Sequence, residues 1–115
     1  MHMHEYPITM QIVKIAEKAC LDAQAGSVKK ISLVVGDRSG FIGESIDMYF
    51  RVISEGTRCE GAQIEMRRVE AKVRCPACGE LFKRPLMSFA CPSCGTDGEP
   101  TETGKEFYIE EIEVE

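Results

Sequence analysis

Apolar residues near the start of the chain recur every three or four positions, which predicts an amphipathic helix over residues 7–25. The residues on its apolar face are Ile8, Ile12, Ile15, Ala16, Ala19, Cys20 and Ala23. Pro7 suits the first turn, where a missing N–H costs no intrahelical hydrogen bond. We expect Gly26 to end the helix in a left-handed conformation, which glycine adopts at little cost.

The next apolar pattern has a period of two, as expected for a strand with one buried face. In the segment KKISLVVG, residues 29–36, Ile31, Leu33 and Val35 fall on one face. A polar loop with two glycines follows, and helical spacing then resumes through about Ser54. The apolar residues of this second, short helix are Ile46, Tyr49, Phe50 and Ile53.

Two further strands are predicted, one on each side of a cysteine-rich segment. Apolar residues alternate over residues 62–66 and change parity from Val69, which indicates a bulge or a strand that passes into another unit. The last strand is KEFYIEEIEVE, residues 105–115, in which apolar residues alternate with glutamates. We expect the two strands to lie side by side where the segment is inserted, near Val73 and Lys105.

The cysteine-rich segment contains two copies of Cys-Pro-x-Cys-Gly, with twelve residues between Cys78 and Cys91. Two thiolates from each turn can meet at one tetrahedral metal ion, and a four-thiolate set suits zinc. The predicted zinc ligands are Cys75, Cys78, Cys91 and Cys94. Each glycine follows the second cysteine of its copy, where the chain turns back and a positive φ is expected. Iron in a rubredoxin-like site, two disulfides, or four free thiols are the alternatives.

These elements predict an α+β fold with a small three-stranded sheet, two helices and an inserted zinc-ribbon-like module. The expected domains are residues 1–72 together with 104–115, and residues 73–103. A chain of 115 residues can bury one modest core and such a module, but not two ordinary domains.

Charge and composition narrow the class of protein. The net charge is −5, distributed as −1 over residues 1–71, +3 over residues 72–96 and −7 over residues 97–115. A zinc ion bound by four thiolates would lower the net positive charge of residues 72–96 further. We therefore expect no basic face for binding nucleic acid. Neither a stretch of about 18 apolar residues nor a signal-peptide layout is present, so we expect a cytoplasmic protein without membrane contact. In that reducing compartment Cys20 and Cys59 should be free thiols.

Several segments in combination resemble one known family. They are Met3-His4-Glu5-Tyr6, VGDRSG at 35–40, GTRCEGAQIEM at 56–66, the two Cys-Pro-x-Cys-Gly copies, and GKEFYIEEIEV at 104–114. Together they are similar to HypA/HybF, the nickel metallochaperones of nickel–iron hydrogenase maturation. The resemblance implies a nickel-binding α/β domain and a structural zinc. It also implies a HypB-type GTPase and the hydrogenase large subunit as partners, and no enzyme activity.

The resemblance places nickel at the Met-His-Glu start, and the residue types there suit this metal. Ni²⁺ favours nitrogen and oxygen ligands, imidazole among them. His4 can chelate nickel together with backbone amide nitrogens, while the Glu5 carboxylate either binds or orients the site. Because Met1 and His2 precede the usual start of the family, His2 is a further candidate nickel ligand. Alternatively these two residues are the remnant of an expression tag, or the histidines are solvated and idle.

Three classes of function remain open. A nickel carrier is favoured over a rubredoxin-like iron redox module and over a zinc-ribbon adaptor that binds RNA or another protein. No residue pattern indicates catalysis, and the Asp37-Arg38 pair is expected to be a turn ion pair. The acidic C-terminal strand would either steer a basic partner or form an ordinary solvated face, through Glu110, Glu111, Glu113 and Glu115.

Overall fold

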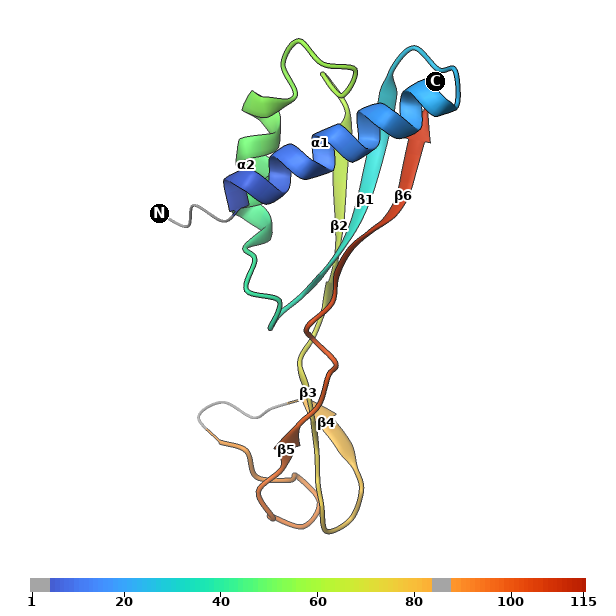
Figure 1. Ribbon diagram of the computed structural model, residues 1–115. Helices are drawn as coiled ribbons and strands as arrows, with labels where there is room; N and C mark the ends of the chain where they lie inside the picture. Colours follow the sequence, from blue (N-terminus) through green and yellow to red (C-terminus); the bar gives the residue numbers. More distant parts are fainter. Residues whose placement is uncertain (1–4, 84–87) are drawn as a thin grey trace.

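In residues 5–83 and 88–115, which this computed structural model describes, the chain forms two helices and two small sheets (Figure 1). The helices are α1 (Glu5–Asp22) and α2 (Gly43–Ile53). The strands are β1 (Val28–Gly36), β2 (Gln63–Val69), β3 (Lys72–Arg74), β4 (Leu81–Lys83), β5 (Glu99–Pro100) and β6 (Phe107–Val114). The predicted α+β class is confirmed. Neither helix in the described ranges is long and apolar enough to cross a bilayer.

The first sheet has the strand order β2-β1-β6. β1 is parallel to β2 and antiparallel to β6, so that Ile31 lies opposite Ile64 on one side and Ile112 on the other. α2 lies in the crossover that joins the two parallel strands. The expectation that the strands flanking the insertion are neighbours is therefore wrong for this sheet. With β2 on one edge of β1, the last strand pairs with the edge that remains.

Both helices pack on one face of this sheet and bury a continuous apolar core (Figure 1). The predicted strand face of Ile31, Leu33 and Val35 belongs to this core. The helices contribute Ile12, Val13, Ala16, Cys20, Ile46 and Phe50. Complete burial of one such aliphatic or aromatic side chain stabilises the fold by about 1.5–3 kcal/mol.

α1 starts earlier than its apolar pattern predicted and presents a slightly different face. It begins at Glu5, ahead of Pro7, and ends at Asp22. Ile15, which was placed on the buried face, is instead 50% exposed. Thr9 and Val13 are buried in its place, because the stripe that faces the core is centred one position away from the predicted stripe.

The cap of α1 also differs from the prediction. Gln24 has the positive φ, at 56°, and Gly26 does not have one. The Ala25 N–H donates to the Cys20 carbonyl at 2.9 Å, which is the wide hydrogen bond of a Schellman cap. Gly26 lies in the short segment that leads into β1, and its N–H donates to the Glu115 carbonyl at 2.8 Å.

The second sheet has the order β4-β3-β5, with both pairs antiparallel. Its small core consists of Val73, Phe82, Cys75 and Cys91. β2 ends at Val69 and β3 begins at Lys72, so the change of parity marks a strand that leaves one sheet and enters the next. Two segments of chain join the sheets, one before β3 and one after β5 (Figure 1).

Two glycines allow segments of the backbone to lie very close to one another where the two sheets are joined. A Cβ on Gly36 would lie 2.1 Å from the Gly104 carbonyl oxygen, and one on Gly104 would lie 2.8 Å from the Ala71 Cα. The close approach is held by the Arg38 N–H, which donates to the Gly104 carbonyl at 2.6 Å. Gly104 additionally has a φ of 105°, which favours glycine.

Gly36→Ala is expected to lower the free energy of unfolding by about 1–3 kcal/mol, because backbone atoms must move to admit the methyl group. Thermal unfolding followed by circular dichroism measures this change. Gly26→Ala is the matched control, because a Cβ there lies 3.9 Å from its nearest neighbour, the Glu115 carbonyl oxygen. Equal melting temperatures for the two variants would contradict the prediction.

Asp37 forms an ion pair across the sheet instead of the predicted turn pair with Arg38. Its carboxylate accepts from Arg68 Nε at 2.5 Å and Nη2 at 2.9 Å, whereas Arg38 Nη1 donates to the Thr101 carbonyl at 2.8 Å. The strand register brings Gly36 opposite Val69 and so places Arg68 beside Asp37. The hydrogen bonds from Arg68 hold the pKa of Asp37 below its ordinary value of 3.8.

Asp37→Asn is expected to lower the melting temperature at pH 7. Because the pKa of Asp37 is lower in the folded state, its stabilisation is complete above pH 3.8 and is lost as the pH falls through the folded value. The difference between the variant and the parent protein should therefore disappear in strong acid, as measured by thermal unfolding at a series of pH values. Asp47→Asn, which breaks an exposed i,i+4 pair with Arg51, should have a smaller effect at pH 7. A loss for Asp37→Asn that did not depend on pH would exclude the ion pair as its cause.

Candidate metal centres

Each Cys-Pro-x-Cys-Gly copy folds into the same tight turn. The Gly79 N–H donates to the Cys75 carbonyl and the Gly95 N–H to the Cys91 carbonyl, both at 2.8 Å. The two glycines have φ values of 75° and 77°, as the sequence predicted. The turns are closed by Cys75 N–H to the Glu80 carbonyl and by Cys91 N–H to the Thr96 carbonyl, each at 2.9 Å.

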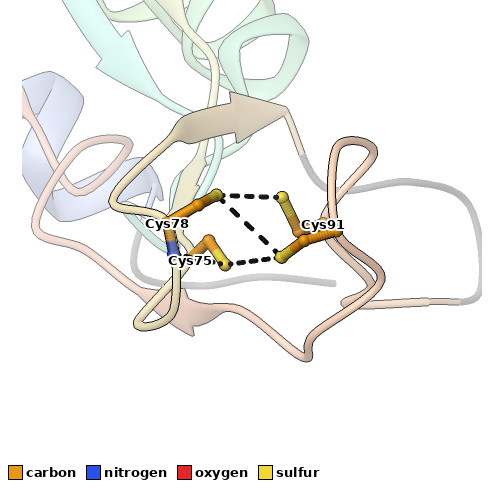
Figure 2. Close-up of side chains that lie close together, drawn as sticks. Cys75, Cys78 and Cys91 are labelled. Atoms are coloured by element: carbon orange, nitrogen blue, oxygen red, sulfur yellow. Dashed lines mark hydrogen bonds between the residues drawn. The ribbon is translucent and has the colours of Figure 1, made fainter.

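The two turns bring four sulfur atoms together (Figure 2). All four Sγ atoms lie within 4.8 Å of one another. The Sγ–Sγ distances are 3.4 Å for Cys75 and Cys94, 3.7 Å for Cys78 and Cys91, and 4.0 Å for Cys78 and Cys94. A tetrahedral zinc with Zn–S bonds of about 2.3 Å requires sulfur atoms about 3.8 Å apart. The cluster therefore has the dimensions of a mononuclear four-thiolate site.

In each turn, the first and the second cysteine have different surroundings. Cys75 and Cys91 are buried, whereas Cys78 and Cys94 are exposed. Backbone N–H groups point at the buried sulfurs, from Cys78 to Cys75 Sγ at 3.5 Å and from Ser93 to Cys91 Sγ at 3.4 Å. Such donors stabilise thiolates, which is the form that binds metal.

The protonation of the two exposed thiols is shifted in opposite directions. Hydrogen bonds from the side chain and backbone of Thr96 lower the pKa of Cys94 to about 6. At Cys78 a backbone hydrogen bond at Glu80 lowers the pKa, but hydrogen bonds with Cys75 and Cys91 outweigh it and raise the pKa to about 12. Without metal the cluster thus shares its protons unequally, and a bound cation would displace them.

A side-chain hydrogen bond links the two turns outside the sulfur cluster. The Ser93 hydroxyl donates to the Glu80 carboxylate, and the same carboxylate oxygen lies 3.8 Å from Cys91 Sγ. Glu80 follows the first turn and Ser93 lies inside the second, so the bond holds one turn against the other. The sequence carries no signal for this pair, because neither its residue types nor its spacing form a recognisable motif.

Of the predicted nickel residues, His2 and His4 lie outside the described part of the chain. Glu5 is fully buried, and its Oε2 accepts from the Ile42 N–H at 3.1 Å. Its carbonyl accepts from the Thr9 hydroxyl at 2.5 Å. Glu5 therefore ties the start of α1 to the loop that precedes α2. Both helices lie at the end of the molecule opposite to β3 and β4 (Figure 1).

The other two cysteines belong to the core of the first sheet. Cys20 and Cys59 are fully buried free thiols, as expected. Burial raises the pKa of Cys59 to about 11, and its thiol donates weakly to the Val13 carbonyl at 3.8 Å. Both side chains are enclosed by the apolar core, where a cysteine packs as a small hydrophobic residue.

Comparison with known proteins matches nearly the whole chain to one family. The family model described as "HypA: Hydrogenase/urease nickel incorporation, metallochaperone, hypA" matches residues 3–114. Hydrogenase maturation factor HypA of Caldanaerobacter subterraneus subsp. tengcongensis is 38% identical over 114 residues, which cover 98% of this chain and 100% of the relative. Hydrogenase maturation factor HypA of Dehalococcoides mccartyi is 34% identical over 113 residues, covering 98% and 95%.

Solved structures show that the fold is shared as well. A solution structure of HypA protein superposes with a TM-score of 0.68 at 20% identity, covering 100% of this chain and 98% of the other. The solution structure of the Ni metallochaperone HypA from Helicobacter pylori has a TM-score of 0.62 at 19% identity and 96% coverage of both chains. The matched sequence runs from the segment before α1 to the end of β6 and includes both cysteine turns, and so the chain belongs to the HypA family of metallochaperones for nickel incorporation.

Proposed function

We propose that this chain carries Ni(II) as cargo on its N-terminal segment. In the cytoplasm it would deliver the metal to a hydrogenase large subunit with the help of a HypB-type GTPase. His4 is the proposed principal ligand, Glu5 holds the site in place, and His2 is a further candidate ligand. The observation that carries the proposal is the family match, which begins at Met3 and so includes the Met-His-Glu start. The proposed role is metal transfer, with no enzyme reaction of its own.

The position of Glu5 supports a site at the start of α1. The first N–H groups of a helix have no intrahelical acceptor, so backbone nitrogens there are available to a metal. The imidazole of His4 would complete a chelate with them, in keeping with the preference of Ni²⁺ for nitrogen ligands. Since the Glu5 carboxylate is buried against Ile42, we assign it the role of fixing where the segment leaves the helix.

We propose zinc as the resident metal of the cysteine cluster, held by Cys75, Cys78, Cys91 and Cys94. The sulfur spacing and the amide donors support a closed four-thiolate site, which is typical of structural zinc. Bound there, zinc would supply folding free energy to a module of residues 73–103. Residues 1–72 and 104–115 would form the nickel-binding domain. Purified protein should accordingly be colourless, whereas four-thiolate ferric iron absorbs visible light.

A largely exposed apolar surface begins in the first turn of α1, directly after the proposed nickel segment in the sequence. We call it the helix patch and define it as Tyr6, Met10, Met48, Tyr49 and Val52. The rings of Tyr6 and Tyr49 pack edge to face, with their centroids 5.4 Å apart. This contact joins the α1 residues of the patch to its α2 residues. Met48 and Val52 are 55% and 65% exposed, on the same side of α2 as Tyr49. We propose that the GTPase docks on this patch, close to the metal it receives.

Met48→Glu combined with Val52→Asp is expected to weaken association with the GTPase by about tenfold or more, because charged groups would enter an apolar contact. Nickel transfer should slow to the rate of simple dissociation. Both effects can be measured with purified partners, by calorimetry and by a chelating dye. Leu21→Asp, on an equally exposed site at the other end of α1, is the control that should leave association unchanged. If the patch variant associates and transfers nickel normally, the docking assignment is wrong.

The acidic last strand has a simpler explanation than partner steering. Glu113 and Glu115 lie within 4.0 Å of Lys30 and Lys29 of the neighbouring strand β1, and Glu110 lies 3.5 Å from Arg67 on β2, the strand beyond it. These charges therefore complete the solvated face of the sheet. We leave them out of the proposed docking surface.

A further inference from the structure

β2 is an edge strand whose outer side carries no strand in the described part of the chain. The sheet order places β1 on one side of it only. Along such an edge, alternate residues direct N–H and C=O groups outward, where another strand can pair with them. The edge runs over seven residues, Gln63–Val69.

A groove lies beside this edge, between β2 and α2. α2 packs against α1 and stands off from β2, leaving a cavity of about 760 Å³. Its apolar lining includes Phe50 of α2 together with Ile64 and Met66 of β2. Gly43 and Met66 lie close to each other in the lining, since a Cβ on Gly43 would lie 2.8 Å from Met66 Sδ. This size is within the range of about 300–1,000 Å³ that is usual for binding sites.

Of the three acids that line the groove, two form ion pairs within the described part of the chain. Asp37 is paired with Arg68 and Asp47 with Arg51 at the rim. Glu44 also lines the groove and is exposed, and it takes part in no ion pair with the described residues. An occupant with a lysine or arginine at this point would therefore be complementary in charge.

We propose that the β2 edge and its groove bind an extended peptide segment of a partner protein by strand addition. Backbone hydrogen bonds would join it to β2, apolar side chains at alternate positions would fill the groove beside Phe50 and Met66, and a basic side chain would meet Glu44. A second copy of this chain fits less well, because a joint sheet would bring both α2 helices over the same junction. The groove lining includes Ile42, whose N–H donates to Glu5, but peptide binding by the β2 edge does not depend on the proposed nickel function.

The test uses the full-length, zinc-loaded protein and a set of short synthetic peptides. Each peptide has Val, Ile, Leu or Phe at alternate positions, threonine between them and one lysine. In an extended peptide, alternate backbone amides point to opposite edges of the strand. Each peptide is therefore also made in two N-methylated forms, one with the amides of the first edge methylated and one with those of the second. Binding is followed by NMR of the protein amides. We expect shifts confined to β2 and α2, and we expect methylation of one edge alone to weaken binding by about tenfold or more.

Variants of the protein provide an independent check. Met66→Lys should weaken binding of the best peptide by about tenfold, and Glu44→Gln should reduce its salt dependence. Glu55→Gln, an exposed acid outside the groove, is the matched control. All three should keep the circular dichroism spectrum and nickel affinity of the parent protein, so that loss of peptide binding is separable from failure of the nickel site.

Three results would each overturn the proposal. The first is that no peptide of the set shifts the amides of β2. The second is that both methylated forms bind equally, because strand addition uses only one edge of the peptide. The third is that the β2 amides shift with protein concentration in the absence of peptide, since a second copy would then be the occupant.

Discussion

Cys91→Ser is expected to abolish tight zinc binding and to unfold the second sheet while α1 and α2 remain folded. The sulfur of Cys91 is one of four that meet at the cluster, and it is buried in the small core with Val73 and Phe82. Structural zinc contributes apparent folding free energies of about 10–16 kcal/mol in small zinc peptides. The second sheet buries too few apolar residues to fold without that contribution, whereas the helices pack on a separate core.

Metal analysis and NMR of the amides test this expectation directly. The parent protein should contain one zinc per chain, and Cys91→Ser should contain close to none. The amides of β3 and β4 should lose their dispersion while those of β1 keep it. Cys20→Ala is the matched control, because it removes a buried thiol from the other core and should retain zinc. A visible iron band, or a folded second sheet in metal-free protein, would disprove the zinc assignment.

His4→Ala is expected to abolish nickel binding, whereas His2→Ala should leave it almost unchanged. His4 directly precedes Glu5 in the sequence, and the buried carboxylate of Glu5 fixes the start of the helix. Imidazole and amide donors must lose protons to bind a metal. Nickel affinity should therefore fall as the pH drops through about 6.5, the ordinary pKa of histidine. Equilibrium titration with nickel at several pH values measures both effects.

Removal of Met1 and His2 provides the complementary variant. It leaves a free amine on Met3, which is an additional nitrogen donor, so affinity should stay equal or rise. Thr9→Val probes the helix start without touching a proposed ligand, because it removes the hydroxyl that donates to the Glu5 carbonyl. It should leave nickel stoichiometry intact. If His2→Ala abolishes binding and His4→Ala does not, the site lies at the extreme terminus and the assignment of His4 is wrong.

Local periodicity was enough to predict the helices and the main strands. The strand face of Ile31, Leu33 and Val35 was correct because alternation of side chains is a property of extended backbone. The helix stripe was less accurate, with Ile15 exposed. Several residues spaced three or four apart satisfy a helical pattern, and the partner surface decides which of them are buried.

The cysteine cluster was predictable for a similar reason. Each Cys-Pro-x-Cys-Gly turn places two sulfurs by local geometry, and Gly79 and Gly95 have the positive φ that the turn needs. The link from Ser93 to Glu80 was not predictable, because it depends on how the two turns face each other. Likewise, the pairing of Asp37 with Arg68 follows from strand register, not from distance along the chain.

The sequence by itself determined the α+β class, the two cysteine turns and the family resemblance, because short-range spacing and residue type carry all three. Only the tertiary structure decided the strand order β2-β1-β6, the burial of Glu5 against Ile42 and the groove beside β2. The strand order and the Glu5 contact join residues about 30 or more positions apart, and the groove brings together side chains of α2 and β2. Their energies depend on which surfaces meet after the chain has folded, and several pairings satisfy the same local pattern equally well.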